Sequence, residues 1–474
     1  MINLINKNTL KALICIGAIN FTTGCANMHS DYVSPQIKVP AHWEGKTSGE
    51  VNSADKWWTR FGDPALDHLI EAVLRSNNDL AAATIRVQRA RLESGLVATN
   101  RTPNVSVGAN ANTRKDLSGG QTNTSYDATV ALSYELDLWG KLASARDAGA
   151  WRALATEQDR QATALSLVGT TATFYWQIAF LNEQIATSQQ TLTYLEQILA
   201  LVQVRFDAGA ATRLDLVQAE QALVAQRVEQ TQLEQSRVEA RHAMGILFDE
   251  SPQYRIAELP NMPNIALPEI GEGLPAELVS RRPDMQAAEL RLRETLANVD
   301  QSRASFYPSL TLTGSLGSVS TTLANLLSNP VATLGAGLTL PFVQWNTKKL
   351  TIKVSETRYD EAVVGFRQSL YRSLSEVENT LSARKQLATQ AGQYEQLKNL
   401  SAQAERLARV RYVAGKTGVQ PWLDEQNRQR KAVTTLAQNR LNQLNNLVRL
   451  YQALGGGTVL ALSDDRGSEP SKKL

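Results

Sequence analysis

The sequence predicts a mainly α-helical protein with a small β part, made of two tandem structural repeats. Three observations predict this fold class: a set of landmarks that occurs twice, four segments of alternating hydrophobicity, and long proline-free stretches of helix-forming residues. Each repeat is expected to contain a helix, a β-hairpin, a long helix and a return helix.

The duplication of landmarks is the strongest of these observations. The run VRFDAG, which ends at Gly209, returns as VRYVAG, which ends at Gly415, 206 residues later. Three earlier pairs are separated by 205 or 206 residues and keep the same order: Asp79 and Asp284, Pro103 and Pro308, and Trp139 and Trp345. Similarity at one fixed spacing indicates two copies of a single structural unit.

The amino terminus has the features of an export signal. Residues 1–24 contain Lys7 and Lys11, and an apolar run of eight residues extends from Ala12 to Ile19. Eight apolar residues are too few to cross a bilayer, so a signal peptide is the better interpretation than a membrane-spanning helix. We therefore expect the mature chain to begin after residue 24.

The four residues that end this signal resemble a bacterial lipoprotein box. The run is Thr22-Thr23-Gly24-Cys25, although Thr22 stands where Leu or Val is usual. The resemblance implies that Cys25 is acylated and becomes the first residue of the mature protein. Residue 26 is Ala rather than Asp, which implies the outer membrane as the destination.

Composition and motifs argue against several functional classes. The net charge is +3, and removal of the two signal-peptide lysines leaves +1, so no basic field for nucleic acid is expected. Cys15 leaves with the signal, so the mature chain forms no internal disulfide. The four histidines lack metal-binding spacing, and neither a GxxxxGK(S/T) loop nor a GxSxG motif occurs. We expect no metal, no cofactor apart from the lipid on Cys25, and no enzymatic activity.

Four segments alternate between apolar and polar residues with the period of a β-strand. The clearest is residues 125–138, where Tyr126 and every second residue to Leu138 are apolar. The other three are centred on Val107, Leu312 and Leu338, and polar loops at residues 114–124 and 317–330 join the strands in pairs. Two hairpins per chain are expected.

The alternation alone is equally compatible with a soluble β-sandwich, but three features favour a transmembrane barrel. These are the strand length, the export signal and aromatic residues near the strand ends, namely Tyr134, Trp139, Phe306, Tyr307, Phe342 and Trp345. Four strands cannot close a barrel, since the smallest membrane barrels need about eight. An open sheet edge in hydrocarbon costs several kcal/mol for each unpaired backbone group. Several chains must therefore pool their strands, and a homotrimer would supply twelve.

Between the hairpins the chain is expected to be helical. Proline is absent from residues 104–251 and from 342–420. An apolar heptad-like pattern from Ile178 to Phe206 predicts a packed seam between supercoiled helices, and a helix from Lys141 to Asp207 would be roughly 100 Å long. Gly209 and Gly415 are expected to end the long helices, and return helices follow at residues 210–247 and 418–454.

These predictions divide the chain into ten segments. They are a signal peptide (1–24), a lipidated extended segment (25–56), the first helix of repeat 1 (57–102), hairpin 1 (103–138), the long and return helices (139–247), a proline-rich connector (248–275), the first helix of repeat 2 (276–307), hairpin 2 (308–342), the second long and return helices (343–454), and a carboxyl-terminal tail (455–474).

The repeats, the lipoprotein box and the paired (F/Y)xxG turns together resemble the TolC and OprM type of outer-membrane efflux channel, in particular its lipoprotein branch. The resemblance extends over roughly residues 57–454. It implies a homotrimer with a 12-stranded barrel in the outer membrane and a hollow helical tube in the periplasm. The tube would end in a closed iris that opens when a periplasmic adaptor and an inner-membrane pump, of the RND type, dock on it.

The same resemblance assigns roles to residues of the two turns. Gly209 and Gly415 mark the turns on which the adaptor would dock. Five residues near them match positions of the family's periplasmic gate: Asp215, Asp424, Gln420, Arg411 and Tyr412. Pro421 and Thr417 depart from one branch, in which an Asp and an Arg occupy these positions, so a second acidic ring is absent here.

Other interpretations of these residues and of the whole chain stay open. Asp424 is also compatible with a solvated residue near a helix start, and Arg411 and Asp215 with ordinary surface ion pairs. If three Asp424 carboxylates meet on an axis, they should bind cations or be partly protonated. The chain could serve drug efflux, protein secretion or metal-ion efflux, or it could be a structural coiled-coil lipoprotein of the envelope.

Overall fold

The computed structural model describes residues 28–44, 56–115, 117–119, 122–265, 267–268, 275 and 281–456. The signal peptide and Cys25 lie outside the described residues, as do residues 457–474. The chain divides into two compact units, and both contain part of each long helix. Unit 1 consists of residues 1–37, 86–157 and 287–367, and unit 2 of residues 38–85, 158–286 and 368–474.

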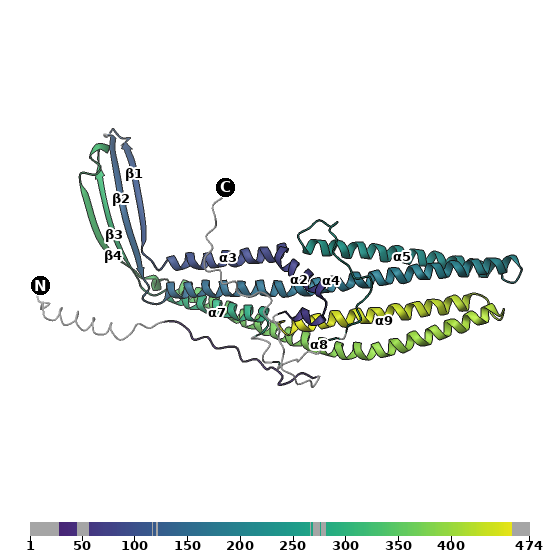
Figure 1. The fold of residues 1–474 in the computed structure, drawn as a ribbon. Helices are drawn as coiled ribbons and strands as arrows, with labels where there is room; N and C mark the ends of the chain where they lie inside the picture. The colour runs from purple at the N-terminus through teal and green to yellow at the C-terminus, as the bar shows by residue number, and fades with distance from the viewer. Residues whose placement is uncertain are drawn as a thin grey trace, which may run out of the picture. The chain divides into compact units, whose positions relative to one another are not determined.

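The elements follow the predicted order of helix, hairpin, long helix and return helix in both repeats (Figure 1). In repeat 1 they are η1 (Trp57–Phe61), α2 (Pro64–Ser76), α3 (Asn78–Thr99), β1 (Asn104–Lys115), β2 (Thr122–Leu136), α4 (Lys141–Asp207) and α5 (Arg213–Leu247). In repeat 2 they are α7 (Pro283–Ala304), β3 (Ser309–Ser320), η3 (Leu323–Asn325), β4 (Pro330–Thr339), η4 (Pro341–Val343), α8 (Trp345–Val413) and α9 (Gln420–Ala453). The predicted fold class is confirmed.

The first helix of repeat 1 was predicted as one element over residues 57–102, and this is wrong. Gly62 adopts φ 65° after η1, and the Asp63 carboxylate then caps α2 by accepting from two backbone N–H groups. Asn77 separates α2 from α3, because its Oδ1 accepts from the N–H groups of Asp79 and Leu80 while its Nδ2 donates to the carbonyl oxygen of Leu247. A short polar side chain that caps the next helix competes with continuation of the previous one.

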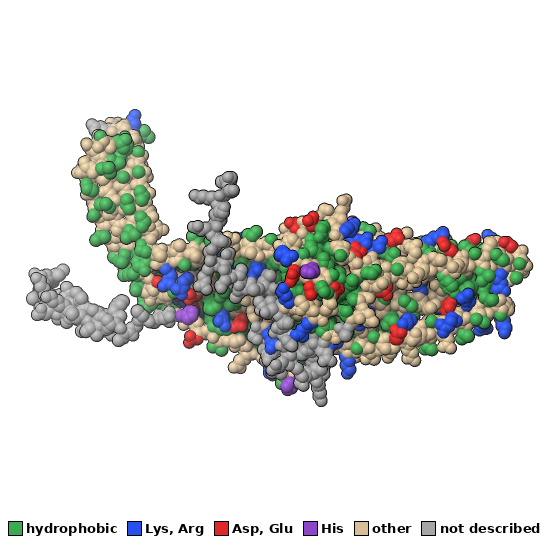
Figure 2. Space-filling model, in the orientation of Figure 1, with side chains coloured by type: hydrophobic (Ala, Val, Ile, Leu, Met, Phe, Trp, Pro, Cys, Tyr) green, Lys and Arg blue, Asp and Glu red, His purple; other side chains and the backbone are tan. Residues whose placement is uncertain are grey.

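The four strands of unit 1 form one antiparallel sheet in the order β1-β2-β3-β4. The register aligns the apolar positions across the sheet: Val107 lies opposite Val130, Val130 opposite Leu316, and Leu310 opposite Leu338. Polar pairs such as Asn110 and Asp127 alternate with them and lie on the other face. Hydrophobic side chains therefore cover one face of the sheet, and they are visible along the strands in Figure 2.

Several strand boundaries differ from the prediction. β1 extends to Lys115 and β2 begins at Thr122, inside the predicted loop 114–124, and β3 extends to Ser320, inside the predicted loop 317–330. β4 begins at Pro330, several residues before the alternating stretch that predicted it, because a proline is tolerated as the first residue of a strand.

The core of unit 2 contains a group of aromatic side chains from η1, α4 and α9. Trp57, Trp58 and Phe61 are buried, and the ring of Trp57 stacks on Tyr451 with centroids 4.7 Å apart. Phe61 meets Trp176 edge to face at 4.8 Å. Trp43 is also buried and belongs to unit 2. Burial of such large rings makes a major contribution to the hydrophobic free energy of folding.

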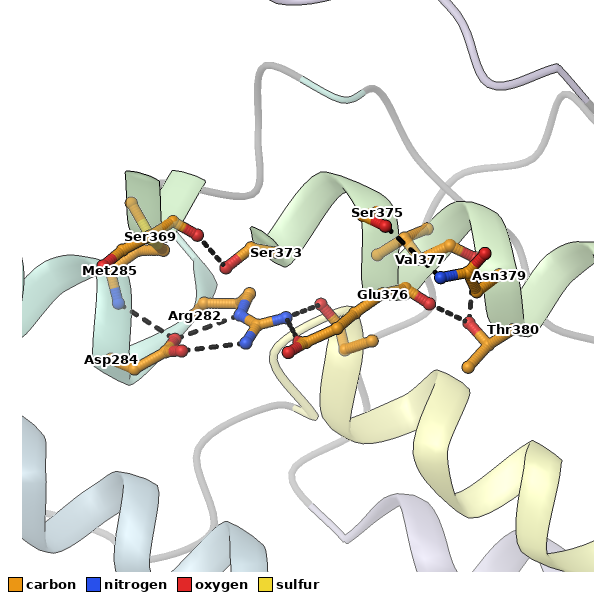
Figure 3. Close-up of polar contacts among 11 residues, drawn as sticks. Arg282, Asp284, Met285, Ser369, Ser373, Ser375, Glu376, Val377, Asn379 and Thr380 are labelled. Carbon is orange, nitrogen blue, oxygen red and sulfur yellow. Dashed lines mark hydrogen bonds and ion pairs between the residues drawn. The ribbon is translucent and has the colours of Figure 1, made fainter. Parts of the chain in front are cut away.

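A buried arginine joins the start of α7 to α8 and α9 within unit 2 (Figure 3). Nε and Nη2 of Arg282 donate to the two carboxylate oxygens of Asp284 at 3.0 and 2.8 Å. Its Nη1 donates to Glu376 at 2.8 Å and to the carbonyl oxygen of Ala453 at 3.2 Å, in the last turn of α9. The guanidinium thus satisfies its donors in a fixed fork and connects three helices.

One described helix is long and apolar enough to cross a membrane by length and composition, namely α4. The apolar stretch of α4 is mostly buried inside the fold, as in the core helix of a folded body.

Candidate functional site at the two helical turns

The two long helices end in turns with the same hydrogen bonds. In the first turn the N–H of Gly209 donates to Phe206 and the N–H of Ala210 to Arg205, and in the second the N–H of Gly415 donates to Tyr412 and that of Lys416 to Arg411. Gly209 and Gly415 have φ values of 72° and 70°. Glycine adopts this left-handed conformation without the steric cost of a Cβ, so both glycines end their helices by the same mechanism. The return helices begin at Arg213 and Gln420, a few residues later than predicted.

Asp215 connects the two turns of unit 2. Its Oδ2 accepts from the backbone N–H and the hydroxyl of Thr212 at 2.9 and 2.6 Å, which completes a capping box at the start of α5. Its Oδ1 accepts from the backbone N–H of Val419 at 2.9 Å, 204 residues away in the chain. Val419 is the N-cap residue of α9 and supplies no side-chain cap itself. One carboxylate of repeat 1 therefore caps a helix in each repeat.

The electrostatic environment favours the ionised form of Asp215. Burial by itself would raise the pKa of its carboxyl, but hydrogen bonds from Thr212 and from the N–H of Val419, together with the charge of Arg205, lower the pKa below its ordinary value. The carboxylate is 9% exposed. Within the described part of the chain the Asp215 carboxylate is held by hydrogen bonds from Thr212 and Val419 and has no ion-pair partner within 4 Å, which differs from the ordinary surface ion pair that was the alternative interpretation.

The arginine that braces the second turn is Arg205, which the sequence analysis did not single out. Its guanidinium lies over the ring of Tyr412 at 4.8 Å and donates to the carbonyl oxygens of Tyr412 at 2.7 Å and Val413 at 3.4 Å. These carbonyls end α8, where a cation is favourable. Arg411, the repeat counterpart of Arg205, is exposed. Arg205 and Arg411 occupy the same position in the runs VRFDAG and VRYVAG, and this equivalence is the sequence signal that could have identified Arg205.

Glu405 forms a second polar centre below the turns, and it was also missed. It is 6% exposed, and its Oε1 accepts from the hydroxyl of Tyr194 at 2.7 Å and from Nε1 of Trp422 at 2.8 Å. Burial and this bond to Glu405 raise the pKa of Tyr194 to about 12, so its hydroxyl remains a donor at neutral pH. A buried carboxylate with these two aromatic donors ties α4 and α9 to α8.

An apolar cluster surrounds these polar contacts and contains residues of all four helices at the turns. Tyr412 is buried, and its ring lies 5.4 Å from that of Trp422. The buried members are Leu195, Ile198, Val202, Leu216, Ala219, Leu223, Tyr412, Val419, Trp422 and Leu423. Close packing makes the ends of the four helices one cooperative structure.

The two remaining predicted gate residues lie on an exposed face of α9. Gln420 and Asp424 are both exposed, and Nε2 of Gln420 donates to Oδ1 of Asp424 at 2.7 Å. The separation of four residues places the two side chains on one face of the helix. Pro421, between them, occupies the first turn of α9, where its missing N–H costs nothing.

The predicted aromatic residues of unit 1 differ in exposure. Trp345 and Phe342 are exposed, whereas Tyr134, Trp139 and Tyr307 are half-buried. Nε1 of Trp139 donates to the carbonyl oxygen of Pro308 at 2.8 Å, and its ring lies 5.1 Å from that of Tyr307. Phe306, which the sequence also places among the aromatic residues near the strand ends, is buried in the single subunit.

No group of three or more His, Cys, Asp or Glu side chains is arranged to hold a metal ion within the residues that the structure describes. The groups at the turns are held by hydrogen bonds to backbone and aromatic donors, an arrangement that fixes helix ends. The contacts at this site therefore fix the ends of the four helices relative to one another.

Residues 69–245 and 274–456 match the outer membrane efflux protein family, so each repeat corresponds to one matched region. The chain is 33% identical to the pyoverdine export outer membrane protein OpmQ of Pseudomonas putida, over 89% of this chain and 92% of that protein. It is 28% identical to the toxin and drug export protein A of Aggregatibacter actinomycetemcomitans, over 94% of this chain and 98% of that protein.

The fold matches solved outer-membrane channels. The open state of the MtrE outer membrane channel of Neisseria gonorrhoeae superposes with a TM-score of 0.82 at 28% identity and covers 92% of this chain and 99% of that one. The family match, the relatives and the fold agree over most of the chain, and the predicted resemblance is confirmed. This chain belongs to the outer membrane efflux protein family.

Proposed function

We propose that the protein is the outer-membrane exit duct of a tripartite efflux pump and passively conducts small drugs or toxic compounds to the exterior. The single observation that carries this proposal is the sheet of unit 1. It has one apolar face, and its outer strands β1 and β4 each pair on one side only within the described residues. Such a sheet is stable in a bilayer only when its edges are closed by further strands.

Three copies would satisfy this requirement. Three four-stranded sheets give a 12-stranded barrel, which is wide enough for an open lumen. The relation to trimeric channels supports this assembly, and the helices would continue the barrel as a periplasmic tube. A lipid on Cys25 would anchor each subunit to the outer membrane.

The partners follow from the same proposal. A periplasmic membrane-fusion adaptor would dock on the turns at Gly209 and Gly415, and an inner-membrane pump, of the RND type, would deliver the cargo. The names of the two export relatives include pyoverdine, toxin and drug, and this supports a small-molecule cargo. Export of proteins or metal ions is the alternative that the experiment below tests. The coiled-coil spacer alternative explains the helices but leaves the apolar face of the sheet without a purpose.

The proposal is tested by deleting the gene and measuring growth on a panel of antibiotics, dyes, detergents, siderophores and metal salts. We expect loss of tolerance to several amphiphilic compounds and recovery when the gene is returned. The purified protein should migrate as a heat-dissociable trimer and conduct ions in planar bilayers. A monomer that conducts no current, from a deletion strain with unchanged tolerance, would contradict the proposal.

Asp424 provides a direct test of the proposed gate. If the three Asp424 side chains meet on the channel axis, replacing Asp424 by Ala removes the repulsive acidic ring and its bound cations. We expect a higher single-channel conductance and a weaker block by divalent cations in planar bilayers. Asp207→Ala, which removes an exposed carboxylate at the end of α4, is the matched control and should change neither. Equal behaviour of the two variants would reject Asp424 as a gate residue.

A further inference from the structure

We propose that the first three turns of α8 bind the phosphate of an anionic phospholipid in the inner leaflet of the outer membrane. This inference rests on the proposed membrane orientation, in which the helices leave the sheet on the periplasmic side. The site is a hollow of about 300 Å³ lined by Trp345, Lys348, Lys349, Ile352, Lys353 and Glu356. These residues are spaced by three or four positions and so share one face of the helix.

The site carries positive charge that the protein does not neutralise. Lys348 and Lys349 have no carboxylate within 4 Å among the residues that the structure describes. Glu356, the only acid lining the hollow, is already bound by Arg303 at 2.9 Å and lies 3.8 Å from Lys353. Two ammonium groups are therefore left for an anion.

Aromatic rings hold one of these ammonium groups in place. Nζ of Lys348 lies 5.4 Å from the ring centre of Tyr307 and 5.7 Å from that of Trp345. Both distances are within the range of cation–π attraction, which orients the ammonium without neutralising its charge. The lysine is thus partly ordered before a ligand arrives.

The surroundings of the hollow match the boundary of a membrane. Tyr307 stands two residues before β3, and Trp345 six residues after the end of β4. In the single subunit Phe342, Val343 and Trp345 are 44%, 74% and 68% exposed, so apolar surface borders the lysines on the side of the sheet. Tryptophan and lysine at this level are the side chains that membrane proteins place at the headgroups. A lipid satisfies both the apolar border and the ammonium groups, whereas free phosphate satisfies only the second.

The test compares lipid retention by the wild-type trimer and by Lys348→Gln/Lys349→Gln. Each basic residue near an anionic membrane surface changes the binding constant by about fivefold, so the double variant should retain phosphatidylglycerol about 30-fold more weakly. Native mass spectrometry of the detergent-purified trimer measures the bound lipid after addition of phosphatidylglycerol or phosphatidylcholine. The control is Lys385→Gln/Lys431→Gln, which removes the same charge from two exposed lysines of unit 2.

We expect wild type and control to retain phosphatidylglycerol in preference to phosphatidylcholine, and excess inorganic phosphate not to displace it. Equal retention by the Lys348/Lys349 variant, equal binding of phosphatidylcholine, or displacement by phosphate would each overturn the proposal. Conductance of the same preparations separates this result from the proposed function. A trimer that conducts normally but shows no lipid preference overturns only the lipid site, whereas a wild type that neither assembles nor conducts overturns the exit duct.

Discussion

Asp215→Ala is expected to open the proposed gate of the channel at the two helical turns. The substitution removes a side chain that caps both α5 and α9, and it leaves the N–H groups of Thr212 and Val419 without their acceptor. Of these contacts only the bond from the N–H of Val419 joins the two turns, and loss of one hydrogen bond to a charged group costs about 2 kcal/mol, enough to change the closed-to-open ratio of a two-state gate by about 30-fold. We expect channels with several-fold higher conductance in planar bilayers.

Asp207→Ala is again the matched control, because Asp207 lies in the adjoining turn, is exposed, and bonds only the neighbouring Gln203 in the same helix. Its conductance should equal that of the wild type. Asp215→Asn should give an intermediate result, since the amide keeps one acceptor oxygen but loses the charge. Wild-type conductance in Asp215→Ala, in a correctly assembled trimer, would show that the cap does not hold the gate.

The pH dependence of the contacts between Asp215 and the two turns follows from the lowered pKa of Asp215. Because the folded-state pKa lies below the unfolded value, the stabilisation by the carboxylate is fully present above the ordinary Asp value of about 3.9 and is lost as the pH falls through the lowered folded value. The hydrogen bonds of the Asp215 carboxylate should therefore persist in the wild type throughout the neutral and mildly acidic pH range. Conductance that rises between pH 7 and pH 5 in the wild type, and not in Asp215→Asn, would contradict this assignment.

Arg205→Ala is expected to loosen the second turn, whereas Arg411→Ala is not. Arg205 donates to two carbonyl oxygens at the end of α8 and covers the ring of Tyr412, and these contacts together are worth about 2 kcal/mol. Removal of the Arg205 side chain should lower the temperature at which a protease cleaves the second turn, and it should raise channel conductance. Limited proteolysis during heating, with fragments identified by mass spectrometry, locates the loosened segment at residues 413–420.

Arg411 is the natural control for this experiment, because it occupies the same position of the other repeat and has the same charge. Arg411→Ala should leave cleavage at the second turn unchanged when it is measured in the same detergent-purified trimer as Arg205→Ala. Equal loosening by both variants would contradict the prediction. It would mean that the contacts of Arg205 with the end of α8 add no more stability than the exposed Arg411 does.

Much of the architecture follows from local patterns that do not depend on distant residues. Period-two alternation marked the strands around Val130 and Leu312, because a sheet with one apolar face requires it. The bounds of α4 followed from the absence of proline and from Gly209, since helix continuation and termination are decided within a few residues. The break at Asn77 rests partly on a local cap, in which its Oδ1 accepts from the N–H groups of Asp79 and Leu80, and partly on a carbonyl 170 residues away, which no local pattern indicates.

The sequence by itself determined that the chain has two copies of one unit, where each hairpin and turn lies, and which carboxylates stand near the turns. Only the tertiary structure decided that Asp215 caps a helix of the other repeat, that Arg205 contacts Tyr412 while Arg411 is exposed, and that Arg282 joins three helices. The physical reason is that a repeated sequence specifies equal local structure, whereas hydrogen-bond partners depend on which helices pack together. When helices of two similar repeats pack together within one chain, equivalent residues meet different neighbours. Arg205 is therefore in contact with Tyr412, while its counterpart Arg411 is exposed.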